Sequence, residues 1–323
     1  MKAGVIGGGA WGTALAQLLA ADGAHVRLWA LEPDVVEAVN RDHANPLYLP
    51  GIPLNPAIEA TGDMAGMADR DMLLVVCPAQ HLRGVVAQAP AGLPLVLCSK
   101  GIEAGSHRLM SEVVQEAQPQ SPIAVLSGPT FASEVAKGLP TAITLACADA
   151  DLAARIAGRI ARPSFRPYLS DDVIGAEIGG AVKNVLAIAC GVAEGAGLGL
   201  NARAALISRG FAEMTRFGLA RGARAETLAG LSGLGDLVLT CSSTNSRNFS
   251  LGKGLGEGQP ASALLANRRT VAEGAFTAPV LREAARASGV EMPVVEAVCA
   301  LLADAAPLSR VIDALLSRPI RAE

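Results

Sequence analysis

The segment EIGGAVKNVL, residues 177–186, contains one lysine within an otherwise small and apolar sequence. A buried ammonium without a partner costs on the order of several kcal/mol, so Lys183 is expected to form an ion pair or to take part in chemistry. Helical spacing would place Gly179, Gly180 and Lys183 near one face, where the glycines let other groups approach. With cations nearby, a partly desolvated lysine can give a proton to a carbonyl oxygen as hydride arrives. The alternative is a surface lysine whose ammonium reaches water.

A glycine pattern near the N-terminus indicates a second kind of chemistry. The segment GGGAWG, residues 7–12, fits G-x-G-x-x-G between a short apolar strand and a helical segment. In this pattern Gly7 permits a tight turn, Gly9 lets the backbone approach a pyrophosphate, and Gly12 lets the helix pack closely on the strand. The helix N-terminus then attracts the anion. The pattern predicts dinucleotide binding, and the alternative is a glycine-rich turn without a ligand.

The second expected strand ends near Trp29 and is followed by Ala30, Leu31 and Glu32. At this place an NAD enzyme usually has a carboxylate for the ribose hydroxyls, and an NADP enzyme has an arginine nearby. Glu32 stands one or two places later than usual, and this run has no basic residue after Arg27. The sequence therefore leaves the cofactor preference open.

Three further loops follow expected strands. They are Pro78-Ala79-Gln80, Ser99-Lys100-Gly101 and Ser127-Gly128-Pro129-Thr130. In an open α/β sheet the ligand crevice lies outside the carboxyl ends of the strands, so these loops are expected to face one another across it. Lys100 is then expected to point toward phosphates or an anionic substrate, although a lysine at a strand end is most often a solvated loop charge.

The second half of the chain offers two more polar candidates. In CSSTNSRNFSLGKG, residues 241–254, Arg247 stands between Ser246 and Asn248. An arginine flanked by such groups can bind phosphate through paired, charge-assisted hydrogen bonds. From the residues alone, a polar surface loop is the better interpretation. Asp236, in GLSGLGDLVL, either brings a carboxylate into the site or acts only as a turn residue.

The order of apolar segments predicts the elements that must position these residues. Segments with strand composition are 3–6, 25–29, 72–77, 93–98, 123–127 and 141–147. Helical periodicity separates most of them, at 11–21, 33–42, 80–89 and 106–117. Strands buried on both faces and alternating with helices predict an α/β fold with a Rossmann-like, doubly wound, mostly parallel sheet. The proline-rich stretch 45–56 is expected to be a loop.

The pattern changes after about residue 175, where the chain becomes rich in Ala and Leu. Helical periods are expected at 181–193, 202–220, 262–266, 278–288, 294–303 and 308–316, with glycine-rich connectors at 230–236 and 252–259. With 323 residues, the chain is long enough for two domains with cores of their own. We predict a dinucleotide-binding domain over 1–176 and an all-α substrate-binding domain over 177–323.

Composition argues against several classes of function. The net charge of −3 and the 3% aromatic content give neither a basic surface nor a stacking platform for nucleic acid. The six cysteines are far apart and mostly in apolar runs, which indicates reduced thiols in a core, and the four histidines lack metal-ligand spacing. A reducing cytosol is therefore expected. The N-terminus resembles a signal peptide, but its glycine spacing and Gln17 favour mature protein, and no later segment is expected to span a membrane.

Seven segments together carry a resemblance to a known family. They are GGGAWGTALA, SKGIE, SGPTFASEVAKGLPTAIT, GGAVKNVLAI, NARAALISRGFAEM, GLGDLVLTC and NSRN. In this order, and over nearly the whole chain, they resemble the bacterial NAD(P)-dependent glycerol-3-phosphate dehydrogenases. The resemblance implies a cytoplasmic oxidoreductase that reduces dihydroxyacetone phosphate to sn-glycerol 3-phosphate with NAD(P)H, for phospholipid synthesis.

The same resemblance implies roles for particular residues, with Lys183 as the catalytic acid/base. The residues at the substrate or nicotinamide end would be Lys100, Gly128, Thr130, Asp236, Ser246, Arg247 and Asn248. The cofactor would contact Gly7, Gly9, Ala10, Trp11, Gly12, Lys100, Ala132, Arg247, Val271 and Glu273. Some relatives carry a polar or basic residue where this chain has Leu31, so the use of both NADH and NADPH does not carry over directly.

Two other functions are compatible with the same residues. Another two-domain dehydrogenase would act on a 2-hydroxy acid or a sugar nucleotide, although the Asn-Ser-Arg-Asn loop favours a small phosphorylated substrate. A non-catalytic dinucleotide sensor would bind the cofactor without turnover and would give no reason for Lys183. A helical second domain is compatible with a homodimer, but the sequence leaves the oligomeric state and feedback regulation open.

Overall fold

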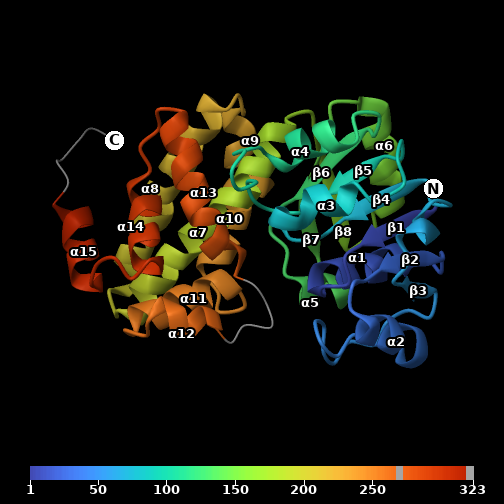
Figure 1. The fold of residues 1–323 in the computed structure, drawn as a ribbon, viewed down its shortest axis with the longest axis horizontal. Helices are drawn as coiled ribbons and strands as arrows, with labels where there is room; N and C mark the ends of the chain where they lie inside the picture. The colour runs from blue at the N-terminus through green and yellow to red at the C-terminus, as the bar shows by residue number, and fades with distance from the viewer. Residues whose placement is uncertain (267–271, 318–323) are drawn as a thin grey trace. The chain divides into compact units, whose positions relative to one another are not determined.

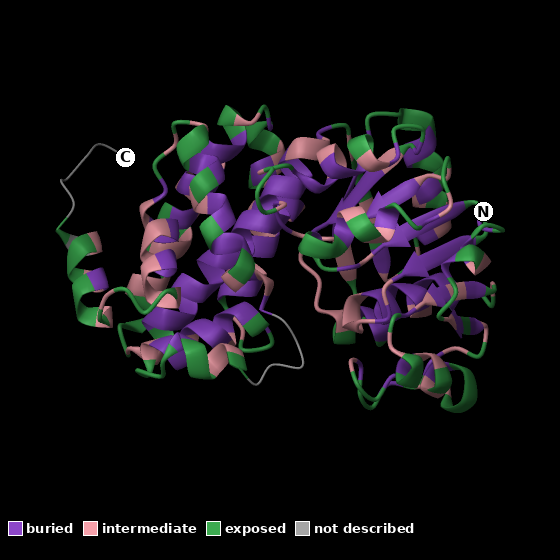
Figure 2. Ribbon diagram, viewed as in Figure 1, coloured by how far each residue is buried: buried purple, intermediate pink, exposed green. Residues whose placement is uncertain are grey.

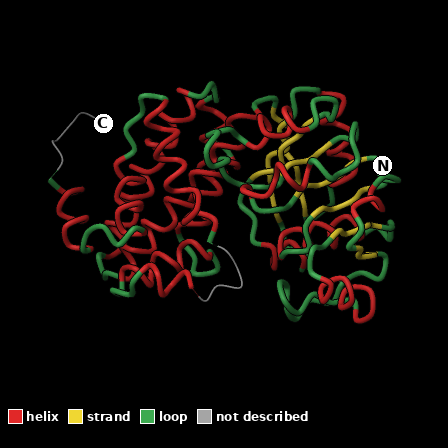
Figure 3. Tube along the Cα trace, viewed as in Figure 1, coloured by secondary structure: helices red, strands yellow, loops and turns green. Residues whose placement is uncertain are grey.

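The computed structural model describes residues 1–266 and 272–317, which form two compact units. The first unit holds Met1–Glu103 and Arg108–Glu177, and the second holds Ala104–His107 and the described chain from Ile178 onward. Within the described chain every strand lies in the first unit, and the second consists of helices joined by loops (Figures 1 and 3). The predicted fold class, an α/β part followed by an all-α part, is confirmed.

The first unit is built around one eight-stranded sheet. The strands are β1 (Ala3–Ile6), β2 (Val26–Trp29), β3 (Ile58–Thr61), β4 (Met72–Val75), β5 (Leu95–Leu97), β6 (Ile123–Ser127), β7 (Thr141–Ala146) and β8 (Phe165–Ser170). Their spatial order is β3-β2-β1-β4-β5-β6-β7-β8, and all neighbours are parallel except β6 and β7. The first six strands in this order have the arrangement of dinucleotide-binding folds, in which the ligand lies where the strand order reverses, beside β1 and β4.

Both faces of this sheet are buried (Figure 2). Val5 and Leu74 belong to one hydrophobic cluster, whereas their sequence neighbours Ile6 and Leu73 belong to another. This alternation follows from the period of two along a strand. The helices of this unit are α1 (Ala10–Ala20), α2 (Pro33–Asp42), α3 (Leu82–Val86), α4 (Met110–Ala117), α5 (Ala132–Ala136) and α6 (Ala150–Ile160), with short 3-10 turns η1 (Met64–Met67) and η2 (Ala79–His81).

The six strands predicted from apolar runs are all present, and the two that were not predicted, β3 and β8, are the edges of the sheet. Edge strands are partly exposed and lack a continuous apolar run. In β8 the side chains of Tyr168 and Leu169 are about half exposed, and Pro167 removes a backbone donor, which an edge tolerates. The stretch 45–56 contains neither helix nor strand, as predicted.

The described part of the second unit packs around one long helix, α7 (Val173–Gly195), in which every residue from Gly175 to Ala193 is buried. The other helices are α8 (Gly199–Ala220), α9 (Ala225–Ala229), α10 (Asp236–Cys241), α11 (Arg247–Gly256), α12 (Ala261–Ala266), α13 (Glu273–Ala287), α14 (Pro293–Leu302) and α15 (Leu308–Leu316). A short π-helical turn, η3 (Leu231–Gly235), leads into α10. Helix α7 is therefore the element against which the polar residues of this unit must be positioned.

The two glycine-rich connectors are helical over most of their length. Residues 252–256 belong to α11, and residues 231–235 form the π-helical turn. A Cβ at Gly252 would lie 2.0 Å from the carbonyl oxygen of Ile188, and one at Gly191 would lie 2.1 Å from that of Phe249. Glycine is used here because the backbones of α7 and α11 touch, not because the chain turns.

Helix α7 bears on the expectation that no later segment spans a membrane. By length and composition, it is long and apolar enough to cross a membrane. However, 83% of its most apolar stretch is buried inside the protein, as in a core helix.

Candidate active site

The glycine loop of the first unit has the geometry that the spacing predicts. Gly7 has a φ of +124°, a conformation that disfavours side chains, and its N–H donates to the carbonyl oxygen of Trp29 at 2.9 Å. A Cβ at Gly12 would lie 1.9 Å from the carbonyl oxygen of Gly7, so the helix could not pack here with a larger residue. At Gly9 a Cβ would meet no atom of the described residues within 4 Å. The space above Gly9 is open to a ligand.

The residues around this loop fit a dinucleotide. Helix α1 begins at Ala10 with Gly9 as its N-cap, and no side chain caps its first N–H groups, which leaves them to an anion. The indole Nε1 of Trp11 is buried without a hydrogen-bond partner among the residues that the structure describes. Trp11 and Ala132 both pack against the same hydrophobic cluster, and their helices α1 and α5 are in contact. The structure thus brings together Gly7, Gly9, Ala10, Trp11, Gly12 and Ala132.

Other predicted residues of this unit follow the neighbouring parallel strands β5 and β6. Lys100 is half-buried and comes three residues after the end of β5. Gly128 directly follows β6, and a Cβ there would lie 3.0 Å from Ile143 Cγ1, so a larger residue would require a small shift of its neighbours. Thr130 Oγ1 donates to the carbonyl oxygen of Gly128 at 3.3 Å. All three residues therefore lie at the carboxyl edge of the sheet, where the ligand crevice is expected.

In the second unit, Lys183 forms a buried ion pair. Its Nζ donates to Asp236 Oδ1 at 2.7 Å and to Thr240 Oγ1 at 2.8 Å. The Lys183 side chain is 8% exposed and that of Asp236 is 0% exposed, so the interpretation as a surface lysine is wrong. These contacts are with a carboxylate and a hydroxyl, so they do not support the expectation of neighbouring cations. Asp236, which the resemblance places at the substrate end, holds the ammonium directly.

Thr240 completes this group, and the sequence analysis did not find it. Its Oγ1 accepts from Lys183 and donates to Asp236 Oδ1 at 3.2 Å, so the three side chains form a closed ring of hydrogen bonds. Thr240 stands four residues after Asp236 on α10, which puts both on one helix face. That spacing is the signal that could have found it. Gly179 on α7 is as close as expected: its Cβ would lie 2.3 Å from the carbonyl oxygen of Ser232.

Three helices of the second unit meet at Asn248. Its Nδ2 donates to Asn184 Oδ1 at 3.0 Å, and its Oδ1 accepts from the N–H of Gly274 at 2.9 Å. Asn184 is next to Lys183 on α7, and Gly274 follows Glu273 at the start of α13. The Asn248 side chain therefore fixes the ends of α11 and α13 beside the lysine. Asn184 is a second participant that sequence reasoning did not single out.

The start of α11 carries the remaining polar candidates. Ser246 is the N-cap of this helix, with its Oγ accepting from the N–H of Phe249 at 3.2 Å. Arg247 is the first helical residue and is exposed. An arginine at a helix N-terminus adds its charge to the positive end of the helix dipole, which suits an anion. Val271 lies outside the described residues.

Two models of protein families match this chain. The model described as NAD-dependent glycerol-3-phosphate dehydrogenase N-terminus matches residues 2–153. The model described as NAD-dependent glycerol-3-phosphate dehydrogenase C-terminus matches residues 172–313. The two matches cover the glycine loop and the lysine group separately.

Individual proteins are similar over the whole length. The chain is 66% identical to NAD(P)+ glycerol-3-phosphate dehydrogenase 1 of Sphingopyxis alaskensis, over 99% of this chain and 97% of that protein. It is 65% identical to NAD(P)+ glycerol-3-phosphate dehydrogenase of Novosphingobium aromaticivorans, over 100% and 98%. A crystal structure of glycerol-3-phosphate dehydrogenase from Coxiella burnetii matches with a TM-score of 0.94 and 38% identity, over 98% of this chain and 99% of that one.

Proposed function

This chain belongs to the NAD-dependent glycerol-3-phosphate dehydrogenase family, and we propose that Lys183 carries the proton-transfer step of its reaction. The protein is an oxidoreductase that reduces dihydroxyacetone phosphate to sn-glycerol 3-phosphate with NAD(P)H. The observation that carries the proposal is the ion pair between Lys183 and Asp236, which is buried within the C-terminal segment of the family match.

Lys183 acts as the general acid. A nicotinamide cofactor, when bound, would supply the hydride for the ketone carbon of the substrate. The carbonyl oxygen then becomes an alkoxide and takes one proton from Lys183 Nζ, which gives the product hydroxyl and a neutral amine. Asp236 and Thr240 accept hydrogen bonds from Nζ and so fix its direction before transfer. A proton from water restores the ammonium for the next turnover.

Residues in each unit are candidates for binding the substrate phosphate. We assign this role to Arg247 with Ser246 and Asn248, helped by Lys100, Gly128 and Thr130. The exposed guanidinium of Arg247 at a helix N-terminus supports the assignment, because two positive features favour a dianion there. Binding energy at the phosphate, which is remote from the reacting carbon, orients the ketone for hydride transfer.

The cofactor is held mainly by the glycine loop. Gly7, Gly9 and Gly12 would leave room for the pyrophosphate, and the N–H groups at Ala10 and Trp11, at the start of α1, would bind it. The remaining contacts in the proposal are Lys100, Ala132, Arg247, Val271 and Glu273. The open space at Gly9, where a Cβ would meet no described atom within 4 Å, supports a ligand at this place.

The cellular setting is also part of the proposal. The product is the backbone precursor for phospholipids, so the enzyme would supply lipid synthesis in the cytoplasm. All six cysteines are buried with free thiols, which suits a reducing compartment. We further propose a homodimer, because helical second domains often support dimers, and light scattering of the purified protein would test it.

The test of function is loss of reduced-nicotinamide absorbance on adding dihydroxyacetone phosphate. Rapid oxidation that requires this substrate, with little on 2-hydroxy-acid precursors or sugar nucleotides, is the expected result. Oxidation of the nicotinamide with another substrate class would replace the proposed reaction with that of a different two-domain dehydrogenase. Tight cofactor binding without turnover on any of them would favour the sensor interpretation instead.

A further inference from the structure

The helical unit contains a cleft of about 590 Å³ that is lined by none of the described residues of the candidate active site. Three helices form it, α13, α14 and α15, and α14 is in contact with both of the others. Figure 1 shows α15 beside α14. The volume lies in the range of small-molecule sites, about 300–1,000 Å³. The lining includes Arg282 and Arg286 on α13, Ala297 and Ala300 on α14, and Val311 and Leu315 on α15.

Small side chains account for this cleft. Ala297 and Ala300 line it from α14, Ala314 lines it from α15, and Ala306 lines it from the loop between the two helices. Because an alanine side chain ends at its Cβ, the helices touch while space stays open between them. Protein interiors are close-packed, and voids larger than a water molecule are few. The described side chains leave this space unfilled, which suits a ligand with an apolar surface of its own.

The ionised side chains of the cleft carry more positive than negative charge. Three arginines and two glutamates line it, namely Arg282, Arg286, Arg310, Glu291 and Glu296. Arg286 is engaged by Glu296, since its Nη2 lies 2.7 Å from Glu296 Oε1. The Nε of Arg282 is buried and forms no hydrogen bond with any residue that the structure describes. The surplus of positive charge favours an anionic ligand.

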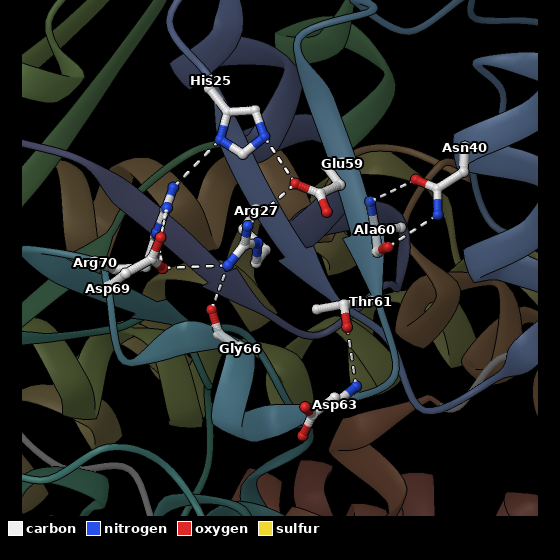
Figure 4. A network of polar contacts seen from close by, with 10 residues as sticks. All are labelled: His25, Arg27, Asn40, Glu59, Ala60, Thr61, Asp63, Gly66, Asp69 and Arg70. Atoms are coloured by element: carbon white, nitrogen blue, oxygen red, sulfur yellow. Dashed lines mark hydrogen bonds and ion pairs between the residues drawn. The ribbon is translucent and has the colours of Figure 1, made fainter.

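The arginines of the first unit show the more usual arrangement. Arg27, on β2, pairs with Glu59 and Asp69, and Arg70, whose side chain is 4% exposed, pairs with Asp69 (Figure 4). Such pairing is expected because a desolvated charge without a partner is costly. Arg282 differs, since it forms no ion pair with the carboxylates of residues 1–266 and 272–317. Its charge is therefore left for a ligand.

The chemistry of the lining narrows the class of ligand. Arginine binds carboxylates and phosphates through two parallel, charge-assisted hydrogen bonds. The described lining has no hydroxyl, amide, imidazole or aromatic side chain, so it offers no neutral hydrogen-bonding group for a sugar and no stacking surface for a base. Apart from its arginines and glutamates it consists of Ala, Val, Leu, Met, Pro and Gly. Such a surface fits an aliphatic chain.

We propose that this cleft is a second ligand site, which binds an aliphatic chain with an anionic headgroup, the headgroup on Arg282 and the chain against the alanines of α14 and α15. The proposal concerns binding alone and goes beyond the proposed function. It stands whether or not dihydroxyacetone phosphate is the substrate. A fatty carboxylate and an alkyl phosphate share this chemistry, so the test compares the two headgroups.

The test is isothermal titration calorimetry of the full chain with octanoate and with octyl phosphate, without substrate or nicotinamide. At least one of these anions is expected to bind once per chain, with a dissociation constant below about 1 mM, and the tighter one identifies the headgroup. The homologue of that anion with two fewer CH₂ groups should bind about tenfold more weakly. Octanol, which lacks the charge, should also bind at least about tenfold more weakly than the anion.

Substitutions then locate the site. Arg282→Gln removes the charge and should weaken binding of the anion about tenfold while leaving octanol unchanged, a difference that a general loss of structure would not produce. Ala297→Leu fills the cleft and should weaken both ligands at least about tenfold. Ala314→Leu does the same from an exposed position on α15. Arg155→Gln, exposed on α6, is the matched control and should leave every affinity unchanged.

Four results would overturn this proposal. They are no saturable binding of either eight-carbon anion to the wild-type protein, octanol binding as tightly as the anion, unchanged affinity for the anion in Arg282→Gln, and unchanged affinity in a folded alanine variant. Thermal unfolding followed by circular dichroism establishes which variants are folded. The two alanine positions lie on different helices, so the loss of one variant to misfolding leaves the other as the test.

Discussion

The two candidate regions of this protein are built in opposite ways. The glycine loop depends on the absence of side chains. Space is open at Gly9, and the backbone of Gly7 touches the helix at Gly12. The lysine group acts through side chains that are present, with Lys183 and Asp236 2.7 Å apart and almost completely buried. One region is specified by shape and the other by charge.

This difference determines which substitutions should disrupt each region. A site made of backbone carries no ionised side chain, so adding a side chain is the change that damages it. A buried ion pair is stable only while both charges are present, so removing one side chain is the change that damages it. Substitutions in the two regions should therefore have different signatures in stability and in cofactor binding.

The largest stability effect is expected for Asp236→Asn. The variant keeps the shape but leaves the Lys183 ammonium buried without its carboxylate, so the free energy of unfolding should fall by about 3–5 kcal/mol. Urea denaturation followed by circular dichroism measures this change. Thr240→Val, which removes only a neutral hydrogen bond, should cost about 1 kcal/mol. Equal losses in the two variants would show that the charge of the pair is not what stabilises this region.

Gly12→Ala is expected to cause the next largest loss in the free energy of unfolding. Its Cβ would lie 1.9 Å from the carbonyl oxygen of Gly7, so the backbone of the loop has to move. Overpacking of this kind costs about 1–3 kcal/mol, and NADH binding should be lost with the loop geometry. Calorimetric unfolding and titration with NADH measure the two effects. A variant with normal stability would mean that the loop can relax around a methyl group.

Gly9→Ala separates cofactor binding from stability, because a Cβ there meets no described atom within 4 Å. Stability should change by less than about 1 kcal/mol, the cost of alanine at a helix N-cap. The dissociation constant for NADH should still rise about tenfold, since the methyl group occupies space that the pyrophosphate needs. Unchanged binding would place the pyrophosphate elsewhere.

The smallest expected effect is the pH dependence of stability that the buried thiols cause. Burial raises the pKa of Cys98 to about 12 and that of Cys299 to about 11, against an ordinary value of 9.0. A raised pKa stabilises the fold at pH values below the ordinary one, and that stabilisation is lost as pH rises toward 11. Native protein should not react with a thiol reagent at pH 8, and its denaturation midpoint should fall between pH 9 and pH 11. Fast labelling of folded protein would contradict this.

The sequence predicts the shape-based region better than the charge-based one. Gly7, Gly9 and Gly12 lie within six residues, and each has a local steric reason that spacing alone reveals. Lys183 can be recognised as anomalous from its apolar neighbours, but Asp236 and Thr240 are 53 and 57 residues away. Their contact with the lysine depends on how α10 packs on α7, which local patterns do not contain.

The same distinction between local patterns and long-range packing explains which elements of the fold could be predicted from the sequence. Interior strands were predicted because both faces are apolar, whereas the edge strands β3 and β8 carry polar or exposed residues such as Glu59 and Tyr168. The glycines of α11 were interpreted as loop formers because a glycine that packs against another helix looks the same in sequence as one that turns. Only the facing residue, such as Ile188 on α7, tells the two apart.

The most direct test of the central claim is to measure turnover and NADH affinity together in Lys183→Ala. Lys253→Ala is the matched control, because this lysine lies on α11 with its side chain 44% exposed, and it pairs with Glu257. If Lys183 gives the proton, turnover should fall by about 10²–10⁴-fold while the dissociation constant for NADH stays within about twofold of wild type. Near-normal turnover in a folded variant that binds NADH would contradict the role assigned to Lys183.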